Sequence, residues 1–229
     1  MKVSAVIPVK GFRNAKQRLS AILTNARREA LAEAMFRDVL RAVIGARGLV
    51  ETVVVTGDEE VAQIAQSSGA RVLRENAETG ETDAVDLGRT RLKNSGCEAV
   101  LIVPGDMPLV RSADIELLLD QVPAGQIAPF ALLVPSHDRL GTNALILAPP
   151  DIIKLRFGYD SFSYHLRQVS ARGLPIRCFD NKHIALDIDE PRDLERFLTG
   201  AVDKTETLAA LRRFAAEQSA PPVRRAGEA

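Results

Sequence analysis

The stretch KVSAVIPVK, residues 2–10, decides how the rest of the chain is interpreted. Its side chains are apolar and β-branched without polar alternation, which is typical of a strand covered on both faces of a sheet. Directly after it comes GFRNAKQRL, residues 11–19, with one glycine and several cations. We therefore expect a central strand that leads into a basic loop at the edge of the sheet.

Strand and helix patterns alternate along the rest of the chain. Apolar residues recur at three- and four-residue spacing from Ala26 to Arg47 and predict an amphipathic helix that ends near Gly48. Further strands are expected at 50–57, 70–75, 98–106, 129–136 and 143–150, and further helices at 58–69, 83–95, 112–121, 161–173 and 190–198. Because parallel neighbours need crossover connections, this alternation predicts an α/β fold with a mostly parallel, Rossmann-like sheet.

Two exceptions modify this prediction. The strands on either side of SHDRLGTN, residues 136–143, have no helix between them, so we expect an antiparallel β-hairpin added to the parallel core. Residues 1–200 are expected to form one domain. Residues 201–229 are expected to hold a surface helix at 203–218 and a disordered end over the last ten residues. The hairpin offers strand edges that could pair between subunits in a homodimer, although the sequence does not show the oligomeric state.

Composition limits the partners. Thirty basic residues balance thirty acidic ones, so no overall field attracts nucleic acid or a membrane surface, and any anion site must be local. Cys97 and Cys178 lack CxxC spacing and are too few for a disulfide framework. No signal-like segment precedes the first strand and no apolar run approaches the ~18 residues of a membrane span. The cytoplasm is the expected compartment.

The basic loop is the first candidate site. Lys10, Arg13, Lys16 and Arg18 follow the first strand closely, and in open α/β sheets ligands bind beyond the carboxyl ends of the strands. Lysine and arginine can neutralise the oxygen atoms of a polyphosphate. The alternative is a solvated loop with ordinary surface ion pairs. The loop is neither a GxxxxGK[ST] nor a GxGxxG motif.

Carboxylates follow two other segments. Asp106 in VPGDMPLV comes after a buried strand through a rigid turn, where a carboxylate can bind a hard cation or only accept backbone amides. Asp187 and Asp189 in LDIDEPRDL are two residues apart and so lie on one side of an extended segment. They favour a cation between them, although Asp189 or Glu190 could instead cap the helix that Pro191 starts. Together with the basic loop, the three aspartates favour Mg²⁺-assisted phosphoryl or nucleotidyl transfer.

These motifs carry a resemblance. In their order, PVKGFRNAKQRL, PGDMPL, GTNALILAPP, FGYDSFSYH and DIDEPRDL resemble the 2-phospho-L-lactate and phosphoenolpyruvate guanylyltransferase family, over roughly residues 2–198. That family has the nucleotide-diphospho-sugar transferase fold, of the GT-A type. The resemblance implies that a phosphorylated three-carbon acid attacks the α-phosphorus of GTP and releases pyrophosphate, in the biosynthesis of coenzyme F-420. A sugar-phosphate nucleotidyltransferase and a non-catalytic nucleotide-binding domain are the alternatives.

The resemblance also implies residue roles. Asp106, Asp187 and Asp189 match the family's Mg²⁺ ligands. The acceptor contacts of the family are matched by Thr142, Gly158 and Ser161. Chemistry and position assign Lys10, Arg13, Lys16 and Arg18 to the triphosphate. The acceptor itself stays open among 2-phospholactate, phosphoenolpyruvate and 3-phosphoglycerate.

Some residues keep two interpretations. Thr82 and Asp83 stand where family members commonly have a Leu-Asn pair, which leaves the preference for GTP open. Asp160 either caps a helix or faces a metal ion. His165 lies one helical turn after Ser161 and either touches a substrate or is a structural hydrogen-bonding residue. His137 and His183, which lack partners at metal-ligand spacing, are expected at the surface.

Overall fold

The computed structural model describes residues 1–75, 80–123, 129–200 and 204–219. The strands are β1 (Val3–Pro8), β2 (Leu49–Thr56), β3 (Arg71–Arg74), β4 (Ala99–Ile102), β5 (Phe130–Pro135), β6 (Thr142–Ala148) and β7 (Ile176–Cys178). The helices are α1 (Asn25–Ile44), α2 (Glu59–Ser67), α3 (Glu81–Asn94), α4 (Ser112–Asp120), α5 (Ser161–Ser170), α6 (Pro191–Gly200) and α7 (Glu206–Ser219). A 3₁₀ turn, η1 (Gln17–Leu19), ends the basic loop. The predicted alternation of strands and helices is confirmed.

Within the described residues, seven strands form one sheet in the order β3-β2-β1-β4-β6-β5-β7. β1 pairs in parallel with β2 on one side and β4 on the other, as predicted for a central strand whose residues are all buried. The predicted hairpin is β5–β6, and β6 is antiparallel to both β4 and β5. The sheet is therefore mixed and mostly parallel.

The hairpin lies inside the sheet, not beside it. β6 is paired on both sides, and β5 is paired with β6 and, in parallel, with β7. β3 and β7 are the outer strands of the described sheet. The hairpin edges on which the homodimer was argued are thus already used within the chain, and the homodimer stays a prediction without that argument.

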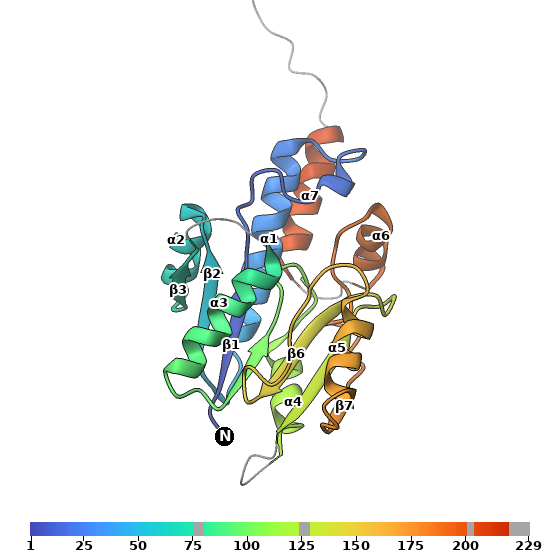
Figure 1. The fold of residues 1–229 in the computed structure, drawn as a ribbon. Coiled ribbons are helices and arrows are strands. Elements are labelled where there is room, and N and C mark those ends of the chain that lie inside the picture. The colour runs from blue at the N-terminus through green and yellow to red at the C-terminus, as the bar shows by residue number, and fades with distance from the viewer. Residues whose placement is uncertain (76–79, 124–128, 201–203, 220–229) are drawn as a thin grey trace, which may run out of the picture.

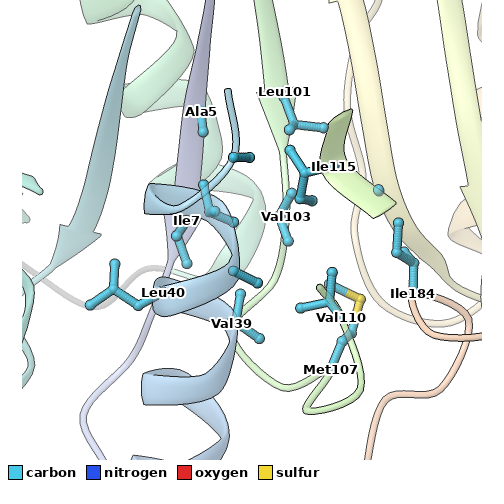
Figure 2. Close-up of a cluster of buried hydrophobic side chains, with 14 of the residues drawn as sticks. Ala5, Ile7, Val39, Leu40, Leu101, Val103, Met107, Val110, Ile115 and Ile184 are labelled. Atoms are coloured by element: carbon cyan, nitrogen blue, oxygen red, sulfur yellow. The ribbon is translucent and has the colours of Figure 1, made fainter. Parts of the chain in front are cut away.

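Helices cover both faces of the sheet (Figure 1). One apolar cluster joins α1, α2 and α4 to the face that carries Ala5 and Ile7 of β1 (Figure 2). The other joins α3 and α5 to the face that carries Val6. The uninterrupted apolar sequence of β1 follows from this burial on both sides.

The C-terminal helix packs more closely than expected for a surface helix. α7 lies along α1 (Figure 1), and its residues Leu208 and Phe214 are buried in a cluster with α1 and α6. Asp38 of α1 is buried and accepts the backbone N–H groups of Glu206 and Thr207, both at 2.9 Å, which caps the start of α7. The expected disorder of residues 220–229 lies outside the described residues. Among the described helices, none has the length and apolar composition needed to cross a bilayer.

Candidate active site

The basic loop, residues 9–19, is held between two buried anchors. Phe12 and Leu19 are buried, and between them Lys16 adopts a left-handed backbone conformation with φ of 52°. This bend turns the Lys16 side chain inward, where Nζ donates to Oδ2 of Asp106 at 2.8 Å and to Oδ1 of Asp189 at 2.7 Å. Lys16 is therefore the counter-ion of two of the predicted metal ligands.

Buried neighbours fix the position of Asp106. Met107, the next residue, is fully buried in the cluster beneath β1 and β4 (Figure 2). The carbonyl oxygen of Asp106 accepts the backbone N–H of Ile188 at 3.2 Å, which links this turn to the segment that carries the other two aspartates. The Asp106 carboxylate itself accepts from Lys16. The carboxylate thus faces the ammonium of Lys16, and its role as a metal ligand stays a prediction.

The segment 184–189 alternates as predicted. Ile184, Leu186 and Ile188 are buried, and Asp187 and Asp189 alternate with them and are only partly buried. The helix that follows is capped by Asp193, whose Oδ2 accepts the backbone N–H groups of Asp189 at 3.2 Å and Glu190 at 2.8 Å. The carboxylate of Asp189 is thereby left to face Lys16. The alternative in which Asp189 caps the helix does not hold.

The charges on this cluster are unevenly compensated. Burial alone would raise the pKa of Asp189, but the ammonium of Lys16 holds it below its usual value. The pKa of Asp187 is raised, first by burial and then by the charge of Asp106, although Asn143 donates a hydrogen bond to it at 3.0 Å. Burial, together with the charge of Asp106, also raises the pKa of Glu81 to about 7. The cluster thus holds more negative charge than Lys16 neutralises.

Two cavities adjoin the cluster. The first, of about 580 Å³, is called the basic cavity because Lys10, Arg13 and Lys16 line it; Met35 and Phe36 of α1 add apolar wall. The second, of about 550 Å³, is called the hydroxyl cavity because Thr142 and Ser161 line it.

The predicted residues divide between these cavities. Arg18 lines the hydroxyl cavity, apart from the other three loop cations, and reaches Glu190 at 3.5 Å. Gly158 lies on the same wall as Thr142 and Ser161. Glu81, Asp106 and Asp189 line both cavities. Two ligands bound in the two cavities would therefore meet at these carboxylates.

The FGYDS turn, residues 157–161, closes one wall of the hydroxyl cavity. Gly158 has φ of 97°, and a β-carbon there would meet no atom within 4 Å, so backbone conformation and not crowding requires glycine. Asp160 precedes α5, and hydrogen bonds from Ser163 and Arg167 hold its pKa below the usual value. The Asp160 carboxylate thus faces side chains of its own helix, although it accepts no backbone N–H as a helix cap would.

The histidines differ from one another. His165 is fully buried and bonded to Thr142 Oγ1 at 2.9 Å, so it is a structural hydrogen-bonding residue. His137 lies at the surface beside Arg196. His183 is only partly exposed, because its Nδ1 lies 3.0 Å from both carboxylate oxygens of Asp114.

Sequence reasoning missed several residues of the two cavities. The sequence did not point to Glu81 as a site residue, because acidic residues are common in the first turn of a helix, where the helix dipole favours negative charge. Its neighbour Thr82 accepts the backbone N–H of Phe157 at 2.9 Å and so joins α3 to the FGYDS turn. Arg192 and Arg196 of α6 line the hydroxyl cavity, and only the fold brings them to Thr142.

The predicted Mg²⁺ site depends on the oxygen donors that the three aspartates supply. Among the described residues, no three His, Cys, Asp or Glu side chains lie close enough together to hold a metal ion by themselves. Mg²⁺ is typically bound by one or two carboxylates together with substrate phosphates and water. Asp106, Asp187 and Asp189 supply hard oxygen donors with unneutralised charge, so the donor set fits Mg²⁺ completed by a substrate.

Comparison with known structures shows the fold. A crystal structure assigned to the nucleotide-diphospho-sugar transferases, from Desulfovibrio desulfuricans, superposes with a TM-score of 0.75 at 16% identity, and covers 94% of this chain and 96% of that one. The two chains therefore have the same overall fold.

Sequence comparison is more specific. A phosphoenolpyruvate guanylyltransferase from Rubrobacter xylanophilus is 40% identical over 86% of this chain and 93% of its own length. A 2-phospho-L-lactate guanylyltransferase from Methanothermobacter thermautotrophicus is 35% identical over 85% of this chain and 83% of its own. A 3-phospho-D-glycerate guanylyltransferase from Phenylobacterium zucineum is 34% identical over 82% of this chain and 86% of its own length. The model of one family, described as guanylyl transferase CofC like, matches residues 3–225, and the chain belongs to that family.

Proposed function

We propose that this chain transfers the guanylyl group of GTP to the phosphate of a three-carbon phosphoacid and releases pyrophosphate, in coenzyme F-420 biosynthesis. One observation carries the proposal: the basic cavity and the hydroxyl cavity share the wall made by Glu81, Asp106 and Asp189. A nucleotidyl transfer needs two anionic substrates that meet at a centre of charge stabilisation.

The basic cavity suits the nucleotide. Lys10, Arg13 and Lys16 line it with cations for the triphosphate. Phe36 and Met35 supply apolar wall for a base or ribose. When the bond between the α-phosphorus and the bridging oxygen breaks, negative charge develops on pyrophosphate, and these cations stabilise it.

The hydroxyl cavity suits the acceptor acid. Its phosphate is already a nucleophile near neutral pH, so one of its oxygen atoms forms the new bond to the α-phosphorus without a general base. Thr142 and Ser161 can hold the acid by hydrogen bonds, with Gly158 on the same wall. The protein's contribution is alignment and charge neutralisation.

Mg²⁺ is proposed as the cofactor. Asp106 and Asp189, which line both cavities, and Asp187, which lines the hydroxyl cavity, would hold it together with substrate phosphates. When bound, it supplies a Lewis acid that neutralises phosphate charge. Lys16 would then exchange a carboxylate partner for phosphate oxygen atoms, which its position in the basic cavity allows.

The acceptor is the open part of the proposal. Relatives of this chain carry the names of phosphoenolpyruvate, 2-phospho-L-lactate and 3-phospho-D-glycerate guanylyltransferases. The name of the 40% identical relative favours phosphoenolpyruvate. The two cysteines are free thiols, which suits the reducing cytoplasm proposed as the compartment.

Pyrophosphate release tests the proposal. Purified protein is incubated with Mg²⁺, one of GTP, ATP, CTP or UTP, and each of the three acids in turn. We expect release with GTP and at least one acid, and none with Asp106→Ala. The control is Asp180→Ala, which removes an exposed aspartate paired with Arg139 outside both cavities. Turnover by Asp106→Ala at the wild-type rate would remove Asp106 from the site, and release with none of the acids would refute the function.

A further inference from the structure

The wall of the hydroxyl cavity contains a buried histidine whose two ring nitrogens are both used. His165 lies on α5 and is fully buried. Its Nδ1 is 2.9 Å from Oγ1 of Thr142. Its Nε2 is 3.2 Å from the backbone nitrogen of Arg156 and accepts that N–H. His165 therefore connects the backbone before the FGYDS turn to a hydroxyl of the cavity wall.

These contacts determine where the ring proton is. A backbone N–H can only donate, so Nε2 must be unprotonated. Burial, together with the charges of Arg156 and Arg89, lowers the pKa of His165 to about 4, so the ring is neutral near pH 7. A neutral ring with bare Nε2 carries its proton on Nδ1. Nδ1–H then donates to Oγ1 of Thr142.

The direction of this hydrogen bond decides what Thr142 presents to the cavity. Because Oγ1 accepts from His165, the hydroxyl hydrogen of Thr142 is directed to another acceptor. The opposite tautomer would use that hydrogen on Nδ1 and leave lone pairs toward the cavity, which would repel an anion. Ser161 is arranged in the same way, because its Oγ accepts the backbone N–H of Thr142 at 3.0 Å.

We propose that His165 is a positioning residue that, through its Nδ1–H tautomer, sets the Thr142 hydroxyl as a hydrogen-bond donor toward the anionic acceptor acid. Thr142 and Ser161 then form a pair of hydroxyl donors on one wall of the hydroxyl cavity. Both oxygen atoms receive a hydrogen bond from within the protein, and both hydrogens go to the ligand. This inference rests on the proposed function, since it takes the ligand to be the phosphoacid.

The first test reads the tautomer directly. ¹⁵N-histidine labelling of the wild-type protein gives signals from only three histidines, and His165→Asn identifies those of His165. At pH 7 we expect a protonated Nδ1 and an unprotonated Nε2. A ring protonated on Nε2, or on both nitrogens, would overturn the inference. This result does not depend on turnover, so it stands even if no acid supports pyrophosphate release and the proposed function fails.

The second test separates positioning from support of the fold. Loss of one hydrogen bond to an anion corresponds to roughly a 10- to 100-fold weaker interaction. His165→Leu should therefore raise KM for the acid by that factor and change KM for GTP less than about twofold. His165→Asn, which keeps an N–H near the position of Nδ1, should recover much of the loss. Equal increases in both KM values would contradict the proposal.

A matched control and a double variant complete the test. Val169→Ala lies one turn later on the same buried face of α5 and is also fully buried, so it lowers stability without a contact to Thr142. Its KM for the acid should match that of the wild type. In a Thr142→Val background, His165→Leu should cause no further increase in KM. An increase with Val169→Ala as large as that with His165→Leu, or additive effects in the double variant, would show a purely structural role.

Discussion

Replacement of Lys16 by methionine tests whether the Lys16 ammonium balances the charges of Asp106 and Asp189. Methionine keeps the length and most of the apolar stem but removes the ammonium that joins Asp106 to Asp189. The Lys16 side chain is only 10% exposed, so water reaches the position of the lost ammonium only if the loop opens. We expect Lys16→Met to lower stability and to increase the response of the protein to divalent cations.

The magnitude follows from the exposure of the partners. A hydrogen bond to a charged group contributes roughly 1.5–3 kcal/mol when shielded from water. The side chains of Asp106 and Asp189 are 31% and 44% exposed, so hydration replaces much of each bond in the variant. Repulsion between two carboxylates that no longer share a cation adds about 1–3 kcal/mol. We expect a loss of about 2 kcal/mol, or a Tm lower by roughly 4–8 °C for a chain of this size.

Thermal unfolding with and without Mg²⁺ is the assay. In the variant, the charge that Lys16 neutralised becomes available to Mg²⁺, so a concentration tenfold above Kd should raise Tm by about 3–6 °C. In the wild type, Mg²⁺ alone should have a smaller effect, because Lys16 already holds two of the three aspartates. Addition of GTP should enlarge the wild-type response, because its phosphates offer Lys16 other partners and complete the coordination of Mg²⁺.

Two controls guard the interpretation. Lys10→Met removes an exposed cation from the same cavity and should change the free energy of unfolding by no more than ~0.5 kcal/mol. Sodium chloride at matched ionic strength should not reproduce the effect of Mg²⁺ on Lys16→Met. If Lys16→Met unfolds at the wild-type temperature and responds to Mg²⁺ as the wild type does, the account of Lys16 as the counter-ion of the aspartates is wrong.

Three further predictions concern the fold around the site. The unfolded chain binds a proton at His165 below about pH 6.5, whereas the pKa of His165 in the folded protein is about 4. Between pH 7 and pH 4.5, urea titrations should therefore show that the wild type loses roughly 2–3 kcal/mol more stability than His165→Asn. Equal losses in the two proteins would contradict a buried neutral ring. A β-carbon at Gly88 would lie 2.8 Å from a side-chain atom of Val6. Gly88→Ala should therefore lower the free energy of unfolding by about 1–3 kcal/mol in the same assay, despite the better helix propensity of alanine. An unchanged free energy of unfolding would show that α3 can shift. Asp38→Ala removes the hydrogen bonds to the start of α7, including one from the Thr207 hydroxyl at 2.8 Å. It should lower the free energy of unfolding by about 2–3 kcal/mol and make α7 sensitive to limited proteolysis. Resistance to proteolysis equal to that of the wild type would show that apolar packing alone holds the helix.

The course of the chain through the sheet was predictable only in part. Apolar strands alternating with helices predicted the parallel core, and the missing helix between residues 136 and 143 predicted the hairpin. Nothing local predicted that β6 would insert between β4 and β5. Both strands of the hairpin are apolar throughout, and such strands fit equally well at several places in a covered sheet. Which neighbour they take depends on contacts made by the whole chain.

The carboxylates were more predictable than the cations. Asp187 and Asp189 alternate with buried apolar residues, a pattern that the sequence displays directly. Lys16 and Arg18 look alike in the sequence, two residues apart in the same loop. The positive φ of Lys16 and the burial of Leu19 turn the first inward and leave the second at the hydroxyl cavity. Such a bend depends on tertiary packing, so sequence reasoning assigned both cations to one role.

The two cavities offer different groups for the stabilisation of negative charge, and the difference fits the proposed chemistry. The basic cavity contains the nearly buried cation Lys16, on the side that we propose for the leaving pyrophosphate. In the hydroxyl cavity the buried hydroxyl groups of Thr142 and Ser161 are neutral. Its three arginines, Arg18, Arg192 and Arg196, are all exposed. A cation held tightly against the attacking phosphate would reduce its nucleophilicity, whereas hydroxyl donors orient it at less cost to reactivity. Exposed arginines can still attract the acid from solution. The stronger charge stabilisation is thus placed on the side of the leaving group, where it lowers the barrier.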